Sequence, residues 1–298
     1  MIKKGNESKL LYRKFCNEVT VSSLFPLFAQ PFWLDIFCKN WEVNIIVEND
    51  RLIAALPYCT KGNLLTKRIY LPDVNFYQTI LFAIELSQQQ QQDYTNKLVE
   101  QLPVVLKSFF KFLPKHENLS LSNFKYKKEE YPCYFIATNQ SILLSKHHHR
   151  HLQKGIKNNY TILESNSISK SFQLIQSTFL RQKTASKITL NTFEKLNEVC
   201  TEKNCGKAFD CLDDNKNLLA TIFILEDFST VYYFLSGYDV SFKNSGAMTT
   251  LLNYAINYAL QKQKTFNFCG SRKKSIADFF IGFGAKKMNV IIWKKQLI

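Results

Sequence analysis

Basic residues recur at helical spacing near the middle of the chain. Arg150, Lys154 and Lys157 fall at positions i, i+4 and i+7 of a helix predicted over residues 145–158, so they share one face. Three cations in register can bind adjacent phosphate groups, and the arginine adds a bidentate fork. Four histidines between residues 147 and 151 would add charge to this face below about pH 6.5. We predict a phosphate-binding surface here; an ordinary solvated face is the alternative.

A second candidate anion site is the loop that precedes a long predicted helix. Unpaired backbone N–H groups and the helix dipole attract anions at a helix N-terminus, and glycine lets a ligand approach the backbone closely. A pyrophosphate group and a tRNA 3′ end are both suitable ligands. The alternative is an ordinary helix cap followed by a flexible glycine. The predicted cofactor-binding residues are Lys243, Asn244, Ser245, Gly246 and Ala247.

A third polar segment follows a predicted strand near the C-terminus. Ser271, Arg272 and Lys273 come directly after this strand and bring positive charge to its end. We include them among the predicted substrate-binding residues. A surface loop without a binding role is equally natural at this position.

Candidate catalytic residues are sparse. If an amine attacks an activated carbonyl, a carboxylate can remove its proton and a tyrosine can protonate the leaving group. Glu226, Tyr233 and Asp239 are the residues that we predict for these roles, although no spacing rule fixes any of them. The sequence contains no Ser-His-Asp, Walker or HExxH pattern, which argues against hydrolase and ATPase functions.

The elements that must position these residues are predicted clearly in the second half. Apolar residues at spacings of three and four predict helices, and short β-branched and aromatic runs predict strands. This order favours a mixed sheet with helices on both faces. The predicted helices are residues 145–158, 169–183, 191–203, 247–262 and 275–283, and the strands are 160–164, 208–212, 218–225, 231–237, 265–269 and 290–294.

The first half gives weaker signals. A hairpin is predicted at Glu48, Asn49 and Asp50, and the polar run 87–92 is predicted to be a solvated loop. A helix is expected from Asp93, with a break at Pro103 and a restart through residue 112. The other elements expected are a helix over 31–38 and strands over 43–47, 52–58, 116–123 and 133–138.

Composition excludes several classes of protein. The chain has 298 residues, 46% of them hydrophobic, and a formal net charge of +15. Such a chain can bury a core, and it contains no apolar run of the roughly 18–20 residues needed to cross a bilayer. Its eight cysteines include no CxxC pair, so we expect small buried thiols in a reducing cytoplasm and no metal site. Phosphate-rich partners fit the charge.

The C-terminal motifs resemble those of a known group. Phe266-Asn267-Phe268-Cys269-Gly270-Ser271, Ile276-Ala277-Asp278-Phe279-Phe280 and Gly282-Phe283-Gly284-Ala285 are similar to the ending of Fem-type aminoacyltransferases and BioF2-like acetyltransferases. The resemblance implies an α/β fold of two tandem GNAT-like domains, each a twisted mixed sheet flanked by helices. We expect residues 1–140 to form a divergent N-terminal domain, an acceptor platform, and residues 141–298 the acyltransferase domain.

The same resemblance implies an enzyme. We expect it to transfer an acyl or aminoacyl group to an amine of a phosphate-bearing acceptor, with a cell-wall precursor as one candidate. Acyl-CoA and aminoacyl-tRNA are the two candidate donors, used as substrates without a permanently bound cofactor. The expected partners are this acceptor, tRNA and the anionic face of a membrane at its periphery.

Three positions differ from the group's usual pattern. Asn267 stands where an aspartate is common, Cys269 where glutamate is frequent, and Met248 where the pyrophosphate loop has glycine or alanine. These differences support an alternative prediction, a catalytically inactive GNAT-like module that binds a nucleotide or RNA. The degraded loop and the positive charge favour tRNA as the donor, whereas the general GNAT precedent favours acyl-CoA.

Overall fold

The computed structural model describes residues 2–3, 5–18, 23–63, 65–183 and 188–297. The chain forms two compact units, Met1–Tyr131 with Asn289–Ile298 and Pro132–Met288. It passes from the first unit to the second within β7 (Lys127–Ile136) and returns within β13 (Lys286–Gln296). The C-terminal segment therefore belongs to the same unit as the N-terminal part of the chain. The division at residue 140 stays a prediction, since compactness alone does not define a functional domain.

The second unit contains a mixed sheet with the strand order β7-β12-β11-β10-β9-β8. Only β11 and β12 run parallel; the other neighbouring strands are antiparallel. Its strands, besides β7, are β8 (Thr161–Glu164), β9 (Gly206–Leu212), β10 (Leu218–Glu226), β11 (Thr230–Tyr238) and β12 (Thr265–Asn267). Its helices are α5 (Lys146–Lys157), α6 (Ile168–Arg181), α7 (Leu190–Lys203), η4 (Val240–Phe242), α8 (Ala247–Gln261) and α9 (Lys274–Ile281).

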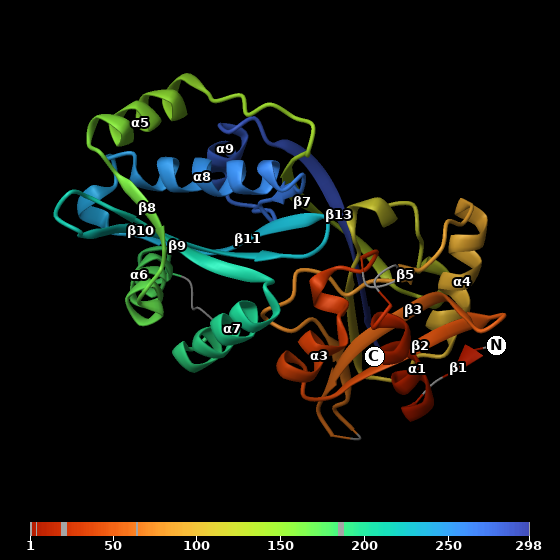
Figure 1. The fold of residues 1–298 in the computed structure, drawn as a ribbon. Coiled ribbons are helices and arrows are strands. Elements are labelled where there is room, and N and C mark those ends of the chain that lie inside the picture. Colours follow the sequence, from red (N-terminus) through yellow and green to blue (C-terminus); the bar gives the residue numbers. More distant parts are fainter. Residues whose placement is uncertain (1, 4, 19–22, 64, 184–187, 298) are drawn as a thin grey trace. The chain divides into compact units, whose positions relative to one another are not determined.

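Helices cover both faces of this sheet (Figure 1). Side chains alternate along β10, so Ile222 and Ile224 pack in the same buried cluster as α8 and α9. Phe223 points the other way and contacts Phe193 of α7, with ring centroids 5.1 Å apart. Both faces of β10 are therefore buried, which explains its continuous apolar sequence. The predicted order of helices and strands in this half is confirmed.

The first unit is also a mixed sheet, with the order β1-β2-β3-β4-β6-β13 and β5 paired with β3. Its strands besides β7 and β13 are β1 (Ile2–Lys3), β2 (Trp41–Glu48), β3 (Arg51–Lys61), β4 (Arg68–Tyr70), β5 (Leu81–Phe82) and β6 (Lys107–Lys111). The helices are α1 (Asn6–Cys16), η1 (Leu27–Ala29), α3 (Pro31–Phe37), α4 (Gln88–Glu100), η2 (Pro114–His116) and η3 (Ser122–Phe124).

The hairpin between β2 and β3 is confirmed. Asn49 and Asp50 both have positive φ angles, 49° and 58°, as the tight turn between twisted strands requires. The predicted loop at residues 87–92 is wrong, because α4 begins at Gln88. Ser87 caps it, and Ser87 and Gln90 form a reciprocal capping box.

Two further predictions in the first unit are wrong. The segment after Pro103 does not restart a helix: β6 (Lys107–Lys111) pairs with β13 and is held as a strand by long-range hydrogen bonds. Residues 116–123 do not form a strand, because the chain there makes the 3₁₀ turns η2 and η3. In both segments the local sequence preference is weak, so tertiary contacts decide the conformation of the chain.

The cysteine prediction needs one correction. Cys38 at the end of α3 and Cys59 in β3 are joined by a disulfide, so these two are not free thiols. The other cysteines are buried and not disulfide-bonded, as expected for small core residues. They are Cys16, Cys133, Cys200, Cys205, Cys211 and Cys269.

Candidate active site in the second unit

The two parallel strands at the centre of the second unit diverge. β11 pairs with β12 only from Thr230 to Tyr232, opposite Thr265 to Asn267. β12 then ends, whereas β11 continues to Tyr238. Beyond Tyr232, none of the described strands pairs with this edge of β11. The divergence therefore leaves backbone N–H and C=O groups available to a ligand.

The end of β12 is set by the side chain of Asn267. Its Oδ1 accepts the backbone N–H of Cys269 at 2.7 Å, and Cys269 and Gly270 both have positive φ angles. This local hydrogen bond competes with the sheet ladder and turns the chain away from β11. An aspartate would accept the same N–H, so the departure from the F-D-F pattern preserves the turn.

A bulge in β11 shapes the residues beside the divergence. Phe223 of β10 lies opposite Leu235, but Ile224 lies opposite Tyr233, so Phe234 is an extra residue. The bulge shifts the alternation of side chains by one position. Tyr233 and Ser236 therefore share a face, and their hydroxyl groups form a hydrogen bond.

Tyr233 lies in an aromatic cluster at this position. Its ring centroid is 6.3 Å from Phe268, which follows β12, and 5.8 Å from Phe280 of α9. Burial raises the pKa of Tyr233, and the hydrogen bond with Ser236 opposes this only in part. The phenol is therefore protonated at neutral pH and suits a proton donor rather than a base.

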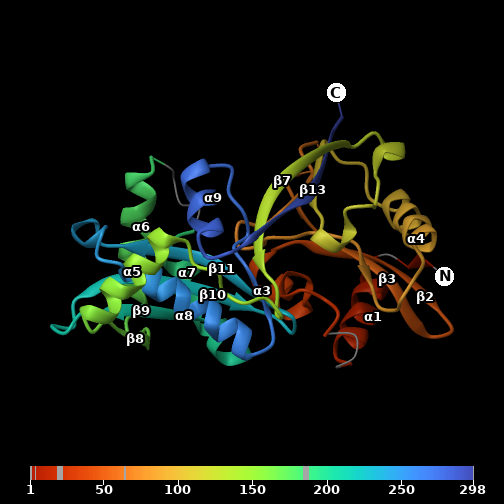
Figure 2. The same ribbon diagram turned by 90° about the horizontal axis from the view of Figure 1, so that it is seen from above.

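The loop before α8 packs against α5 (Figures 1 and 2). Gly246 has a φ of +92°, and a Cβ placed on it would lie 2.1 Å from the carbonyl oxygen of His151. The backbone N–H of Ser245 donates to the carbonyl oxygen of Phe242, and the backbone N–H of Ala247 donates to the Ser245 hydroxyl. The glycine is therefore needed for the close approach of α5 to this loop. The most exposed residues of the loop are Lys243 and Asn244.

The structure brings the basic helix and this loop together. Lys154 Nζ donates to the carbonyl oxygen of Asn244 at 3.2 Å. Arg150 and Lys157 lie exposed on α5, and no described carboxylate forms an ion pair with either. The α5 face therefore has two uncommitted cations next to the start of α8.

Residues 271–273, the third segment predicted to bind a ligand, lie at the same edge of the sheet as the loop before α8. β11 and β12 run parallel, so the loops that follow them leave the sheet on one side. Ser271, Arg272 and Lys273 follow β12, and the Ser271 hydroxyl accepts the N–H of Lys273. Lys273 Nζ also lies 3.4 Å from the side-chain oxygen of Gln182 after α6.

Glu226 is held by a network of donors at the opposite end of α8. Its side chain is 3% exposed and accepts hydrogen bonds from Tyr258, Lys262 and Lys264, the shortest at 2.9 Å. Burial by itself raises the pKa of Glu226, but the hydrogen bonds from the two lysines outweigh it and leave the pKa below its ordinary value. This carboxylate fastens the end of α8 to β10 and is poorly suited to act as a base.

Asp239 has a local role in the turn after β11. Its Oδ1 accepts the N–H of Ser241 at 2.9 Å and so starts the 3₁₀ helix η4. Glu226 lies beside Val231 at the start of β11, whereas Asp239 follows its end. Eight residues of strand separate these points, a distance of about 26 Å. The structure therefore does not bring the three predicted catalytic residues together, and only Tyr233 lies at the divergence.

Arg181 is a residue that sequence reasoning missed. Its Nη2 donates to the carbonyl oxygen of Tyr238 at 2.8 Å, and its guanidinium lies 4.7 Å from the Tyr238 ring centroid. It thereby fixes the end of β11 from the last turn of α6. A basic residue in a last helical turn is too common a signal to have identified it.

His148 differs from its neighbours in the histidine cluster. It is 3% exposed and packs between Phe279 and Phe283, while Ser145 Oγ lies 2.9 Å from its Nδ1. Its Nε2 is buried without a hydrogen-bond partner among the described residues. The side chain therefore fastens α5 to α9 and does not belong to the exposed basic face.

The burial of His148 predicts a pH dependence of stability. Burial, with the nearby His147, lowers the pKa of His148 from 6.5 to about 4. Between these values the unfolded chain binds a proton that the folded chain does not, so stability falls as the pH falls from 6.5 to about 4. The expected loss in the free energy of unfolding is about 3 kcal/mol.

Urea denaturation of the wild type and of His148→Asn at a series of pH values measures this effect. The asparagine can keep the hydrogen bond with Ser145 but does not titrate. His116 has a pKa lowered to about 3 by burial and remains in both proteins, so it cancels in the comparison. Identical pH profiles for the two proteins would contradict the prediction.

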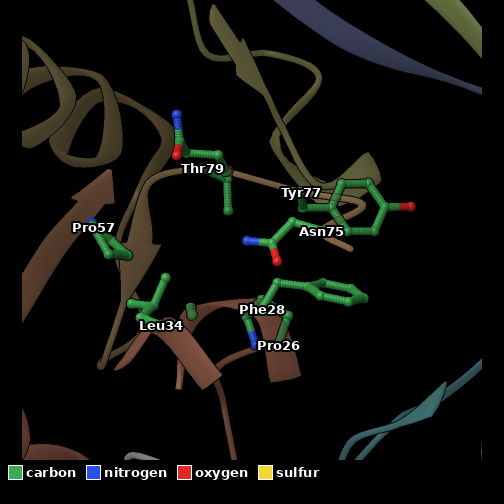
Figure 3. A pocket seen from close by; sticks show the side chains of 9 residues that line it. Pro26, Phe28, Leu34, Pro57, Asn75, Tyr77 and Thr79 are labelled. Carbon is green, nitrogen blue, oxygen red and sulfur yellow. The ribbon is translucent and has the colours of Figure 1, made fainter. Parts of the chain in front are cut away.

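The first unit contains a hollow of about 350 Å³, whose lining includes Val99, Pro103, Tyr126 and Lys295. A second, much smaller hollow in the first unit has a volume of about 10 Å³. Figure 3 shows the amide of Asn75 near its centre, with Phe28 and Pro26 on one side. That volume accommodates about one water molecule. Within the described ranges, no group of His, Cys, Asp and Glu residues is arranged to hold a metal ion. Nor is any described helix both long and apolar enough to cross a membrane.

The arrangement can now be compared with known proteins. No protein-family model and no curated protein sequence matches the chain. The crystal structure of FemX superposes with a TM-score of 0.72 at 11% identity, covering 99% of this chain and 97% of FemX. The chain has the fold of FemX. Together with the tandem GNAT protein described below, this confirms the predicted fold of tandem GNAT-like domains.

Two further solved structures resemble the fold of this chain. The C-terminal domain of a putative lysylphosphatidylglycerol synthetase from Agrobacterium fabrum has a TM-score of 0.58 at 11% identity, covering 98% of this chain and 93% of that one. A tandem GNAT protein from the clavulanic acid biosynthesis pathway has a TM-score of 0.53 at 8% identity, covering 99% and 98%. At these identities the likeness concerns the fold.

Proposed function

We propose that the protein is an acyltransferase that moves an acyl or aminoacyl group from a carrier to an amine of a phosphate-bearing acceptor. The observation that carries the proposal is the divergence of β11 from β12 beside the start of α8. It combines an open strand edge, a protonated phenol and a cationic helix in one region. Solved structures of the same fold include FemX and the C-terminal domain of a putative lysylphosphatidylglycerol synthetase.

The residues present support direct attack of the acceptor amine on the donor carbonyl. Backbone N–H groups on the open edge of β11 can polarise that carbonyl and stabilise the oxyanion that forms. A C–N bond then forms and the C–O bond of an ester, or the C–S bond of a thioester, breaks. Tyr233 is placed to give its proton to the leaving atom, and the proton lost by the amine restores the phenol through water.

The state of the loop before α8 favours aminoacyl-tRNA over acyl-CoA as the donor. The backbone N–H groups of Ser245 and Ala247 already have acceptors, and α5 covers Gly246. These contacts occupy two of the N–H groups that could otherwise bind a pyrophosphate group. The exposed Arg150 and Lys157 suit the phosphates of a polynucleotide. The carrier acts as a substrate, and no permanently bound cofactor is part of the proposal.

The acceptor is proposed to be a cell-wall precursor or an aminophospholipid headgroup, since each carries both a phosphate and an amine. The anionic inner face of a membrane attracts basic proteins, so the net charge of +15 fits a cytoplasmic protein that associates peripherally with anionic lipid. A catalytically inactive binding module is the second candidate. The observation that favours it is the engagement of both predicted carboxylates, Glu226 and Asp239, in structural contacts.

The test is a transfer assay with purified protein, a mixed pool of charged tRNA or acetyl-CoA, and candidate acceptors, with product masses measured. We expect transfer from charged tRNA. The variant Arg150→Gln/Lys157→Gln should lose about tenfold or more in kcat/KM through weaker phosphate contacts. Lys170→Gln/Lys195→Gln is the matched control, since it removes the same charge from exposed positions on α6 and α7.

Each outcome of this assay separates the candidates. Transfer from acetyl-CoA alone would replace the proposed donor. Binding of tRNA without any product, at all acceptors tried, would support the inactive module. Equal losses in both double variants would show that net charge, and not the α5 face, governs the reaction.

A further inference from the structure

The apolar core of the first unit ends in the hollow of about 350 Å³. The walls of this hollow are the end of α4, the loop over residues 102–105, the region of η3, and the strands β6 and β13. On β13, Ile291 and Trp293 are buried in the core cluster, and strand alternation places Lys295 on the same face. The hollow therefore lies where the packed core stops, and its whole lining belongs to the first unit.

Two features of the sequence leave this space unfilled. Ser108 of β6 lies opposite Lys295 of β13, so a small side chain follows the large one of Phe110 along this face. Helix α4 covers the core but ends at Glu100, and Pro103 disfavours helical geometry at the residue before it. The volume that remains is within the range of about 300–1,000 Å³ that is typical of small-molecule sites.

Two hydrogen-bond donors lie in this otherwise apolar lining. Lys295 is half-buried, and its Nζ lies 5.6 Å from the ring centroid of Tyr126. Tyr126 is 8% exposed and accepts a hydrogen bond from the Ser108 hydroxyl at 2.8 Å, and none of the described residues accepts its own O–H. Burial raises the pKa of Tyr126, and the hydrogen bond from Ser108 opposes this only in part, so the phenol keeps its proton at neutral pH.

The charge of Lys295 has no counterion in the part of the chain that the structure describes. Glu100 also lines the hollow, but it is exposed and forms no ion pair with Lys295 or with another described residue. An apolar wall that carries an ammonium group and a phenol donor is complementary to an apolar molecule with a negatively charged end.

We propose that the hollow binds a fatty carboxylate, that is, a single apolar chain that ends in a carboxylate group. The chain lies against Val99, Pro103 and Phe124, where its burial removes apolar surface from water. The carboxylate accepts charge-assisted hydrogen bonds from Lys295 Nζ and from the O–H of Tyr126. The site belongs to the first unit alone and does not depend on the transfer reaction proposed above.

Isothermal titration calorimetry tests the site without any turnover. The ligand is octanoate, and the comparison ligands are acetate, which lacks the chain, 1-octanol, which lacks the charge, and octylammonium, which reverses it. The test variants are Lys295→Met and Val105→Phe, which places a ring in the hollow from its loop wall. Lys107→Met is the matched control, because it removes an exposed lysine whose side chain alternates to the other face of β6. Circular dichroism establishes that each variant is folded.

We expect octanoate to bind the wild type and Lys107→Met with the same affinity, and more tightly than any of the comparison ligands. Its affinity should fall about tenfold or more in Lys295→Met, which loses a hydrogen bond to a charged group. It should fall by a similar factor in Val105→Phe, which loses the space for the chain. Glu100→Gln should bind octanoate more tightly, because the substitution removes a negative charge from the lining.

Three results would overturn the proposal. The first is the absence of octanoate binding to the folded wild type. The second is an affinity for octanoate that is unchanged in Lys295→Met or in Val105→Phe. The third is an affinity for 1-octanol or octylammonium equal to that for octanoate, since the charge of the ligand would then have no effect.

Discussion

Replacing Gly246 with alanine is expected to lower the free energy of unfolding by about 3 kcal/mol or more. The φ of +92° is unfavourable for any residue with a Cβ, at about 1–2 kcal/mol. The new methyl group would also lie 2.1 Å from a backbone oxygen, that of His151, which can move only if α5 moves. Overpacking of this kind adds about 1–3 kcal/mol. Urea denaturation followed by circular dichroism measures the loss.

Gly155 provides the comparison for this prediction. A Cβ there would lie 2.1 Å from Oγ1 of Thr250, a side chain on α8. Removing that side chain makes room, so Thr250→Ala should restore most of the stability lost in Gly155→Ala. The same second substitution should not rescue Gly246→Ala. Rescue of both variants would show that α5 adjusts freely and that the glycine is not required by the crossing.

Replacing Glu226 with glutamine is expected to cost about 3 kcal/mol of unfolding free energy. The substitution removes a buried negative charge and leaves Lys262 and Lys264 without their partner. Glu164→Gln is the matched control, since its ion pair with Lys207 is exposed and should contribute less than about 1 kcal/mol.

A catalytic role for Glu226 predicts a different result. Glutamine would then abolish turnover while the unfolding free energy stayed near that of the wild type. The structural role predicts the reverse order of effects: the protein loses stability, and the surviving folded fraction retains its activity. Measuring unfolding and turnover on the same preparations distinguishes the two.

The second unit could be predicted from sequence because its signals are local. The helices have apolar residues at spacings of three and four, such as Phe172 and Ile175, and both of these are buried. The first unit lacks such signals. The run Gln88–Gln92 has no apolar face, so periodicity missed α4, although the Ser87 and Gln90 capping box was readable.

The candidate site could be predicted only in part. The sequence indicated residues suited to binding anions at Arg150, at Lys157 and in the loop before α8. The structure places the helix and this loop next to each other. The sequence did not indicate the bulge at Phe234 that turns Tyr233 and Ser236 to one face. Bulges and helix crossings depend on tertiary pairing, which residue types and spacing do not encode locally.

The binding of an anionic carrier at α5 and the start of α8 is the central claim, and a melting experiment tests it most directly. The wild type, Arg150→Gln/Lys157→Gln and Lys170→Gln/Lys195→Gln are melted alone, with coenzyme A, and with bulk tRNA at about 50 mM and 200 mM salt. We predict that tRNA raises the melting temperature of the wild type at low salt and less at high salt. This rise should persist in the control and disappear in the α5 variant. A rise that is unchanged in the α5 variant, or no rise with either ligand, would contradict the account.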